Sequence, residues 1–234
     1  MRKLFLFITL LATFVACSKS EDGAENNNPN NKQIRVKVQV GWWIENQDQF
    51  IREDIQDVFG DYLVSIKREA DWYTIILSED YTKLDMIIWG VVECVIDEGI
   101  TIIGDGAIKR GDLLERITLP KSLKLIGNDA FWGCEELAKI TIPDNVTFIG
   151  REAFGNCANL RNVTIGSRVS EIGTAAFWQT SEDLTIYCKP HIPPMQRESF
   201  YPAENLKIYV PYESVDLYKS SWSQYSDVIE GANL

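Results

Sequence analysis

Histidine is almost missing from this sequence. The 234 residues include one, His191, in a Lys-Pro-His-Ile-Pro-Pro stretch that is typical of a loop. Because histidine is the usual general base and metal ligand near neutral pH, chemistry that needs a histidine cluster is excluded. The motifs of zinc proteases, serine hydrolases, phosphate-binding loops and EF hands are absent as well. We therefore predict no catalytic residue, no metal and no cofactor, and we expect that the protein is not an enzyme.

Basic residues are also scarce. Lysine and arginine total 23 against 34 aspartate and glutamate residues, which gives a formal net charge of −11. Nucleic acids and anionic membrane surfaces both attract clustered basic side chains, so neither is an expected partner. A long apolar run is missing too, because the apolar segment 4–15 has 12 residues and a membrane-spanning helix needs about 20. We expect contact with a membrane through a lipid anchor alone.

The N-terminal segment is organised like a signal peptide. Arg2 and Lys3 precede the apolar run 4–15, which is followed at once by Ala16 and Cys17. The sequence Phe-Val-Ala-Cys resembles the bacterial lipobox, although the usual residue at the phenylalanine position is leucine. This resemblance implies that residues 1–16 are removed and that Cys17 is lipidated. An ordinary secretory signal is the alternative.

Residues 17–33 contain almost nothing apolar and include five asparagines and a proline. Such a segment cannot bury enough surface to fold, so we predict a flexible tether. The acidic pair Glu21-Asp22 resembles the surface-export signal of lipoproteins in the Bacteroides group. That resemblance implies an outer-membrane lipoprotein exposed at the cell surface, with a periplasm-facing location as the alternative.

A 23-residue repeat dominates the rest of the chain. Three segments, which begin at Leu114, Leu137 and Leu160, align without gaps. Each carries a Leu-x-x-Ile/Val-Thr-Leu/Ile stretch, then an Ile-Gly pair, then an Ala-Phe pair. A degenerate copy precedes them from Val91, and a partial copy with one residue of slip follows from Leu184. The repeat predicts stacked units that share one continuous core.

Each part of the repeat has a predicted role. The alternation at Ile117, Thr118 and Leu119 indicates a short strand with one buried face, and Pro120 or Pro143 ends that strand. The Ile-Gly pair is expected to place an apolar anchor before a turn with positive φ. The phenylalanine of the Ala-Phe pair is expected to fill the core.

This pattern, written as L-x-x-I-x-I-P…I-G-x-x-A-F-x-x-C, resembles the BspA-type leucine-rich repeat family over residues 91–190. The segment from Leu206 to Pro211, with Val215, Tyr218 and Trp222, resembles the usual end of Bacteroides-group members. The resemblance implies a right-handed solenoid on a secreted or cell-surface protein. Family members are generally adhesins or ligand-binding surface proteins.

The two ends of the solenoid are expected to differ from the repeat. Residues 34–88 read as a small β-α-β-β module, which is either a cap or a second binding module. Residues 89–190 carry the leucine-rich repeats, and residues 191–234 form a strand-helix cap. The predicted fold class is therefore an α+β repeat solenoid of 23-residue period with a module at each end.

The cysteines are mostly explained by the repeat. No two stand at Cys-x-x-Cys spacing, which disfavours zinc and redox roles. Cys134 and Cys157 are equivalent and should stack on neighbouring coils, close enough for a disulfide. We favour buried free thiols, because the third copy has Thr180 at this position. Cys94 aligns with a core strand position, and Cys188 is expected just after the last strand.

The repeat also predicts two ladders of side chains on the outer strand face. One ladder contains Arg116, Lys139 and Asn162, and the other contains Thr118, Thr141 and Thr164, with Thr185 as a possible continuation. They are either a solvated face or a surface for an extended partner. Trp132 and Trp178 are candidate exposed aromatics, although packing between coils is the favoured interpretation.

Two functions fit these features. The first is an adhesin-like surface lipoprotein that binds a protein partner through the solenoid. The second is a surface lipoprotein that captures a polysaccharide for glycan uptake, and an envelope scaffold without a soluble ligand is a further alternative.

Overall fold

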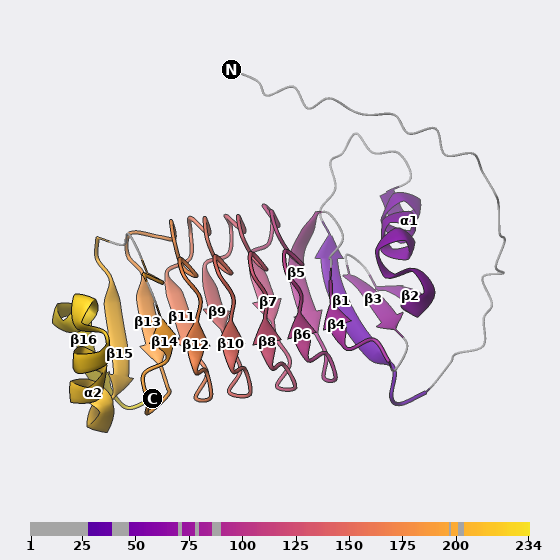
Figure 1. Ribbon diagram of the computed structural model, residues 1–234. Helices are drawn as coiled ribbons and strands as arrows, with labels where there is room; N and C mark the ends of the chain where they lie inside the picture. The colour runs from indigo at the N-terminus through magenta and orange to yellow at the C-terminus, as the bar shows by residue number, and fades with distance from the viewer. Residues whose placement is uncertain are drawn as a thin grey trace, which may run out of the picture.

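The computed structural model describes residues 28–38, 47–69, 72–77, 80–85, 90–196, 198–200 and 204–234. The chain winds into a row of stacked coils, with a small α/β module at the N-terminal end and a helix at the C-terminal end (Figure 1). Successive coils contribute short strands to two faces, which we call the front and the back. In the described part of the chain, no helix is long and apolar enough to cross a membrane.

The back of the solenoid is one continuous parallel sheet of two-residue strands. In spatial order it contains β14 (Met195–Gln196), β12 (Glu171–Ile172), β10 (Phe148–Ile149), β8 (Leu125–Ile126), β6 (Ile102–Ile103) and β4 (Lys83–Leu84). The front strands are β5 (Val91–Ile96), β7 (Arg116–Thr118), β9 (Lys139–Thr141), β11 (Asn162–Ile165), β13 (Thr185–Cys188), β15 (Lys207–Pro211) and β16 (Ile229–Ala232). Strands this short gain stability from stacking on their neighbours rather than from their own length.

A column of phenylalanine rings forms the centre of the core. Neighbouring rings of Phe131, Phe154, Phe177 and Phe200 stack with centroids 4.9, 5.2 and 5.6 Å apart. All four side chains are at most 1% exposed. The spacing is close to the separation of about 4.8 Å between paired strands, so one ring belongs to each coil. The prediction that the repeat phenylalanine fills the core is confirmed, and Ile108 is buried at the same position of the first coil.

The predicted role of the Ile-Gly pair is confirmed for the isoleucine, which is buried just before a turn that contains positive φ, and is wrong for the glycine. Gly150 does not adopt positive φ, whereas Glu152, two residues later, does, at 50°. The glycine is needed for space instead, since a Cβ on Gly150 would lie 2.4 Å from the carbonyl carbon of Gly127 in the preceding coil. Gly127 and Gly173 make equally close approaches. The absent side chain therefore lets consecutive coils touch.

The stacked cysteines are buried free thiols, as favoured from the sequence. The Cys134 and Cys157 thiols donate hydrogen bonds to the carbonyl oxygens of Ile108 and Phe131, at 3.3 and 3.2 Å. The neighbouring Cys157 side chain and burial raise the pKa of Cys134. In the third copy the Thr180 hydroxyl makes a comparable bond, to Phe177 at 3.2 Å. Each residue bonds to the carbonyl at the repeat-phenylalanine position, which belongs to the preceding coil for the two cysteines and to the same coil for Thr180.

The other two described cysteines occupy strands. Cys94 lies in β5 opposite Ile117, as the alignment predicts. Cys188 is the last residue of β13 and lies opposite Ile165, so its predicted position after the strand is wrong. Both thiols are buried, and burial raises their pKa values, to about 12 for Cys188.

An antiparallel module extends the front sheet at the N-terminal end. β1 (Lys32–Val38) pairs with β5 on one side and with β3 (Trp72–Leu77) on the other, and β3 pairs with β2 (Leu63–Glu69). Helix α1 (Gln47–Phe59) runs into the 3₁₀ helix η1 (Gly60–Tyr62). The helix buries Ile51, Ile55 and Phe59 in the common core.

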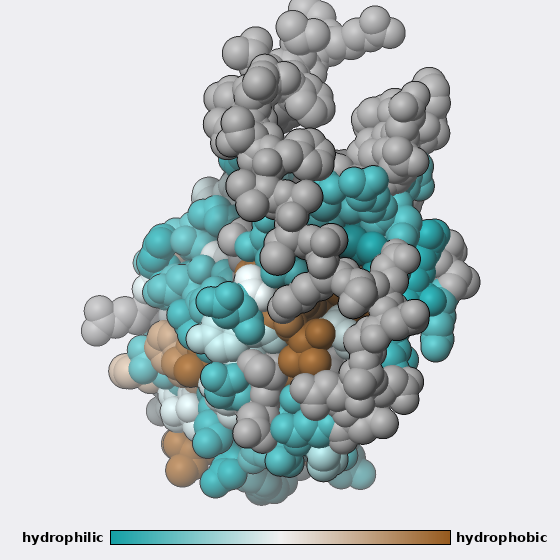
Figure 2. Space-filling model, turned by 90° about the vertical axis from the view of Figure 1, so that its right-hand side faces the viewer, coloured by the Kyte–Doolittle hydropathy of each residue, from teal (hydrophilic) through white to brown (hydrophobic). Residues whose placement is uncertain are grey.

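Seen from this end, the described surface is mostly hydrophilic, with one hydrophobic area near the centre and smaller ones towards the left edge of the view (Figure 2). A mostly polar end surface is what a solenoid cap requires, because an uncovered coil would expose its core.

The C-terminal segment closes the other end. After β15 come the 3₁₀ helix η2 (Tyr212–Ser214), helix α2 (Val215–Ser221), the 3₁₀ helix η3 (Ser223–Val228) and β16. The buried Trp222 packs 5.5 Å from Phe200, the last ring of the column, and its Nε1 donates to the carbonyl of Pro194 at 2.9 Å. The buried Tyr218 hydroxyl donates to Pro190 at 2.8 Å. This packing covers the end of the phenylalanine column.

Candidate binding site

The side chains of both predicted ladders lie on the outer side of three front strands. β9 and β11 pair in parallel, with Lys139 opposite Asn162 and Thr141 opposite Thr164. β7 presents the equivalent residues one coil earlier, and all six side chains are exposed except Thr164, which is half-buried. The structure therefore brings the predicted residues together on one surface: Arg116, Thr118, Lys139, Thr141, Asn162 and Thr164.

Beyond β11 the threonine ladder continues with tyrosine, so the suggested continuation at Thr185 is wrong. Thr185 lies opposite Asn162, while Tyr187 lies opposite Thr164. The rings of Tyr187 and Tyr209 stack on each other with centroids 5.4 Å apart. In the sequence alignment of the repeats, the copy at Leu184 is shifted by one residue, which conceals this pair. In the structure the strand residues keep the 23-residue spacing, so Thr164 lies opposite Tyr187.

The front sheet is interrupted between β7 and β9. Within the residues that the structure describes, β7 pairs with β5 and β9 pairs with β11, but they do not pair with each other. One coil later, the Ile142 N–H donates to the Thr164 carbonyl at 2.8 Å, and no equivalent bond joins β7 to β9. The back sheet stays continuous here, with Leu125 opposite Phe148. The two coils therefore separate on the front alone and leave unpaired strand edges.

Pro143 favours this separation, although Pro120 at the equivalent position does not prevent β7 from pairing with β5. The equivalent of Pro143 one coil later is Gly166, where an added Cβ would lie 2.2 Å from the carbonyl oxygen of Pro143. A proline ring does not fit at so close an approach. Pro143 also lacks the N–H that Lys189, two coils later, donates to Ile165 at 3.1 Å.

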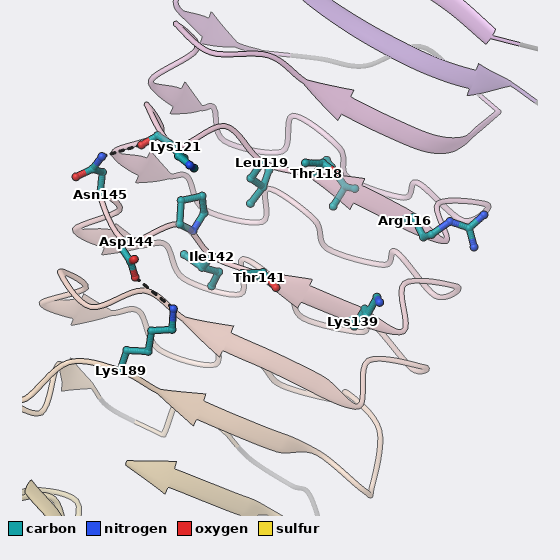
Figure 3. A pocket seen from close by; sticks show the side chains of 12 residues that line it. Arg116, Thr118, Leu119, Lys121, Lys139, Thr141, Ile142, Asp144, Asn145 and Lys189 are labelled. Carbon is teal, nitrogen blue, oxygen red and sulfur yellow. Dashed lines mark hydrogen bonds and ion pairs between the residues drawn. The ribbon is translucent and has the colours of Figure 1, made fainter. Parts of the chain in front are cut away.

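A groove of about 810 Å³ occupies the gap. Its lining includes apolar side chains in the middle and polar or charged side chains around them (Figure 3). Ile117 is half-buried, whereas its equivalents Ile140 and Val163 are at most 2% exposed. At one end the Asn145 side chain donates to the Lys121 carbonyl at 2.8 Å and so joins the two coils. The lining residues are Arg116, Ile117, Thr118, Leu119, Lys121, Lys139, Thr141, Ile142, Pro143, Asp144, Asn145 and Lys189.

The charge of the groove is opposite to that of the chain. Its lining contains four basic side chains and one acid, Asp144. Arg116 is paired with Glu93, and this hydrogen bond lowers the pKa of Glu93. Lys189 lies 3.7 Å from Asp144, whose pKa is lowered by the Ser167 backbone N–H and by Lys189. For Lys139, the described part of the chain provides no ion pair, so its charge faces the groove uncompensated.

The candidate exposed tryptophans are half-buried and lie outside the groove lining. The Trp132 ring has Lys109 Nζ at 5.1 Å and Arg110 Cζ at 5.8 Å from its centroid, on the preceding coil. On the following coil, a Cβ on Gly155 would come within 3.0 Å of the ring. Trp132 thus packs between coils, as favoured from the sequence.

The remaining candidates contribute nothing to this site. Cys17, the predicted lipidation residue, lies outside the described residues. His191 is exposed, with Nδ1 3.1 Å from a carboxylate oxygen of Glu213. The described residues include no group of three histidine, cysteine or acidic side chains placed to hold a metal ion.

Comparison with family models matches residues 91–225 to the BspA type leucine rich repeat region, in six copies. This match covers more than half of the chain. The chain belongs to the BspA-type leucine-rich repeat family. The matched region runs past residue 190, the predicted end of the repeats, and includes β15 and α2. Leucine-rich repeat proteins generally mediate protein interactions or adhesion.

Among solved structures, a leucine-rich repeat protein from Bacteroides ovatus ATCC 8483 is similar to this BspA-type chain. The two are 21% identical with a TM-score of 0.43, over 64% of this chain. The chain spans 40% of the length of that protein. Comparison with curated proteins gives no match.

Proposed function

We propose that the chain is a non-enzymatic cell-surface lipoprotein that binds a partner protein, as an adhesin does, through the groove between β7 and β9. The observation that carries this proposal is the interruption of the front sheet. It opens a groove across two coils that is lined by the predicted ladder residues Arg116, Thr118, Lys139 and Thr141.

An extended polypeptide is the ligand that suits such a groove. The edges of β7 and β9 that face the gap carry backbone donors and acceptors without strand partners in the described part of the chain. Cα atoms of β7 and β9 approach within 8 Å, which is too close for an inserted strand, so an extended chain would lie over the gap and meet these groups from outside the sheet. The half-buried Ile117 adds apolar surface that a ligand side chain would cover.

Site-specific photo-crosslinking tests this function. A photoreactive amino acid replaces Thr141 in the groove, and a matched variant carries it at Thr174, an exposed residue just after back strand β12. We expect a protein adduct from position 141 in intact cells, which mass spectrometry identifies and the purified partner reproduces. Equal adducts from both positions, or none from position 141 when an independent assay shows partner binding, would contradict the proposal.

Polysaccharide capture is the alternative function, and the structure offers it less support. Trp132 packs between coils, and the rings of Tyr187 and Tyr209 cover each other. Sugar recognition by stacking needs an open aromatic face. A glycan array probed with the full chain separates the two functions: strong saccharide binding that is lost in Trp132→Ala would overturn the preference for a protein partner. An envelope scaffold without a soluble ligand would show neither adducts nor saccharide binding.

In the same proposal, lipidated Cys17 anchors the protein in the outer membrane, exposed at the cell surface. The sequence resemblance to a lipobox and to an export signal supports this placement. Protease treatment of intact cells tests it. We expect the wild-type chain to be degraded and Cys17→Ala to leave the membrane fraction. Protection of the wild-type chain would indicate the periplasm-facing location.

A further inference from the structure

The basic side chains of the groove form two pairs, one at each end. Arg116 and Lys139 start β7 and β9, while Lys121 and Lys189 follow front strands β7 and β13. Figure 3 shows the two pairs on opposite sides of the threonine and apolar side chains. A ligand that lies along the groove therefore meets positive charge, then apolar surface, then positive charge again.

Both ends can accept negative charge from a ligand. Arg116 forms ion pairs with Glu93 and Glu115, and Lys189 forms one with Asp144, so these two basic side chains are held in place but share their charge. Lys139 is an exposed strand residue that has no ion pair among the described residues, so its charge is available to a ligand. The whole chain has 34 acidic and 23 basic residues, whereas the groove lining has one acidic and four basic residues. The lining is therefore basic although the chain is acidic.

The spacing of the pairs sets the spacing of the charges in a ligand. Arg116 and Lys121 are five residues apart along one coil, which is at most about 16 Å at 3.3 Å per residue, since β7 ends at Thr118 and Lys121 lies in a turn. In an extended peptide, residues i, i+2 and i+4 point to one face and span about 13 Å, and the long basic side chains can cover the difference. Residue i+2 then lies over the apolar middle of the groove.

We propose that the groove recognises an extended acidic segment of a partner protein in which two carboxylates at i and i+4 flank an apolar side chain at i+2. The proposal rests on the proposed function and adds the chemistry of the partner. The carboxylates pair with the basic side chains at the two ends, and the apolar side chain covers the half-buried Ile117, beside which Leu119 and Ile142 are already buried. The backbone of the segment lies over the gap and not within it, because Cα atoms of β7 and β9 approach within 8 Å and leave no room for a strand between them.

Binding of short labelled peptides to the full chain tests this chemistry. The probe is Gly-Glu-Thr-Val-Thr-Glu-Gly, and matched peptides replace both glutamates by glutamine or the valine by serine. We expect each replacement to weaken binding about tenfold or more, since each removes two ion pairs or one buried apolar group. Raising the salt concentration from about 0.05 M to about 0.5 M should weaken the acidic peptide and leave the glutamine peptide unchanged.

Substitutions in the chain test whether the acidic peptide binds in the groove. The double change Lys121→Gln and Lys139→Gln should weaken the acidic peptide about tenfold. Lys207→Gln, at the ladder position of β15 outside the groove, should bind like wild type. Circular dichroism confirms that each variant folds.

The outcomes separate the two proposals. Equal binding of the acidic and glutamine peptides, with crosslinks still obtained at position 141, would overturn the acidic chemistry and leave the protein-binding function standing. Loss of binding in Lys207→Gln but not in the double variant would place the peptide elsewhere and overturn this inference. Absence of both peptide binding and crosslinked protein would overturn both proposals.

Discussion

Gly127, Gly150 and Gly173 hold neighbouring coils in contact because they carry no side chain. A Cβ at each would lie within 2.6 Å of an atom in the preceding coil, and for Gly150 and Gly173 that atom is main chain. Positive φ occurs instead at residues such as Asp129 and Ala175. From the sequence alone, a glycine required for close approach looks the same as a glycine required for its backbone conformation. The recurrence of the Ile-Gly pair in each copy therefore indicates that glycine is required there, without showing why.

Replacing one of these glycines should weaken the solenoid. Gly150→Ala places a methyl group against the Gly127 backbone, so we expect the free energy of unfolding to fall by about 1–3 kcal/mol, the usual cost of overpacking. Urea denaturation measures it. The matched control is Ala175→Gly. Ala175 has a φ of 57°, so removing its Cβ should relieve about 1 kcal/mol of backbone strain and raise the free energy of unfolding. Wild-type stability in Gly150→Ala would contradict the close-approach explanation.

Buried cysteine and tyrosine side chains should make the protein less stable at alkaline pH. Burial raises the pKa of the Cys188 thiol from 9.0, and of the Tyr73 and Tyr81 hydroxyls from 10.0, to about 12. Between these values the unfolded chain releases protons that the native chain retains, so the free energy of unfolding decreases as pH rises from 9 towards 12. Thermal melting at pH 8 and pH 11 measures the change. A midpoint that is constant or higher at pH 11 would contradict this account, and Cys188→Ala should show a smaller decrease.

At the scale of the strands, the separation of β7 from β9 is the feature that makes the site. The copies that begin at Leu114 and Leu137 share nearly the same strand sequence and a following proline. Nothing in that pattern distinguishes a paired front strand from an unpaired one. The difference appears when Pro143 is compared with Gly166, and it depends on distances between coils that the sequence does not contain.

Replacing the proline should narrow the groove. In Pro143→Gly the ring is removed and an N–H becomes available, so we expect β9 to approach β7 and the Leu119 and Thr141 amides to exchange more slowly with deuterium. Affinity for the groove ligand should fall in parallel. Unchanged exchange at these amides would show that Pro143 is not what separates the coils.

The C-terminal cap should be required for stability as well as for coverage. Trp222 is 2% exposed, packs on Phe200 and donates a hydrogen bond to Pro194. Trp222→Ala leaves a cavity at the end of the phenylalanine column, which should cost about 3–5 kcal/mol. Chemical denaturation measures the loss, with the exposed Tyr212→Ala as the control. A loss no larger than that of the control would mean that the cap is not part of the cooperative core.

At the scale of the whole molecule, the sequence predicts the solenoid well and the site only in part. The repeat places the phenylalanine column and the front ladders, because stacked units impose the same environment on equivalent residues. It does not predict the groove, since the ladders were expected to form one regular surface. Lys121 and Lys189 of the basic lining are missed for the same reason, because their place depends on how particular coils meet, whereas the tyrosine pair is hidden by the slip assumed at Leu184.

The charge distribution also belongs to this scale. A chain of net charge −11 repels acidic partners on most approaches, while the basic groove attracts them locally. Association with an acidic partner should therefore depend on orientation and become less salt-sensitive when Lys121 and Lys139 are neutralised.

Hydrogen–deuterium exchange of the full chain, with and without the partner identified by crosslinking, tests the central claim most directly. We predict slower exchange on binding in residues 116–121 and 139–145, which line the groove, and unchanged exchange in back strands β8 and β10. Protection confined to the back sheet or to α1, with none at the groove, would contradict the claim that the gap between β7 and β9 is the binding site.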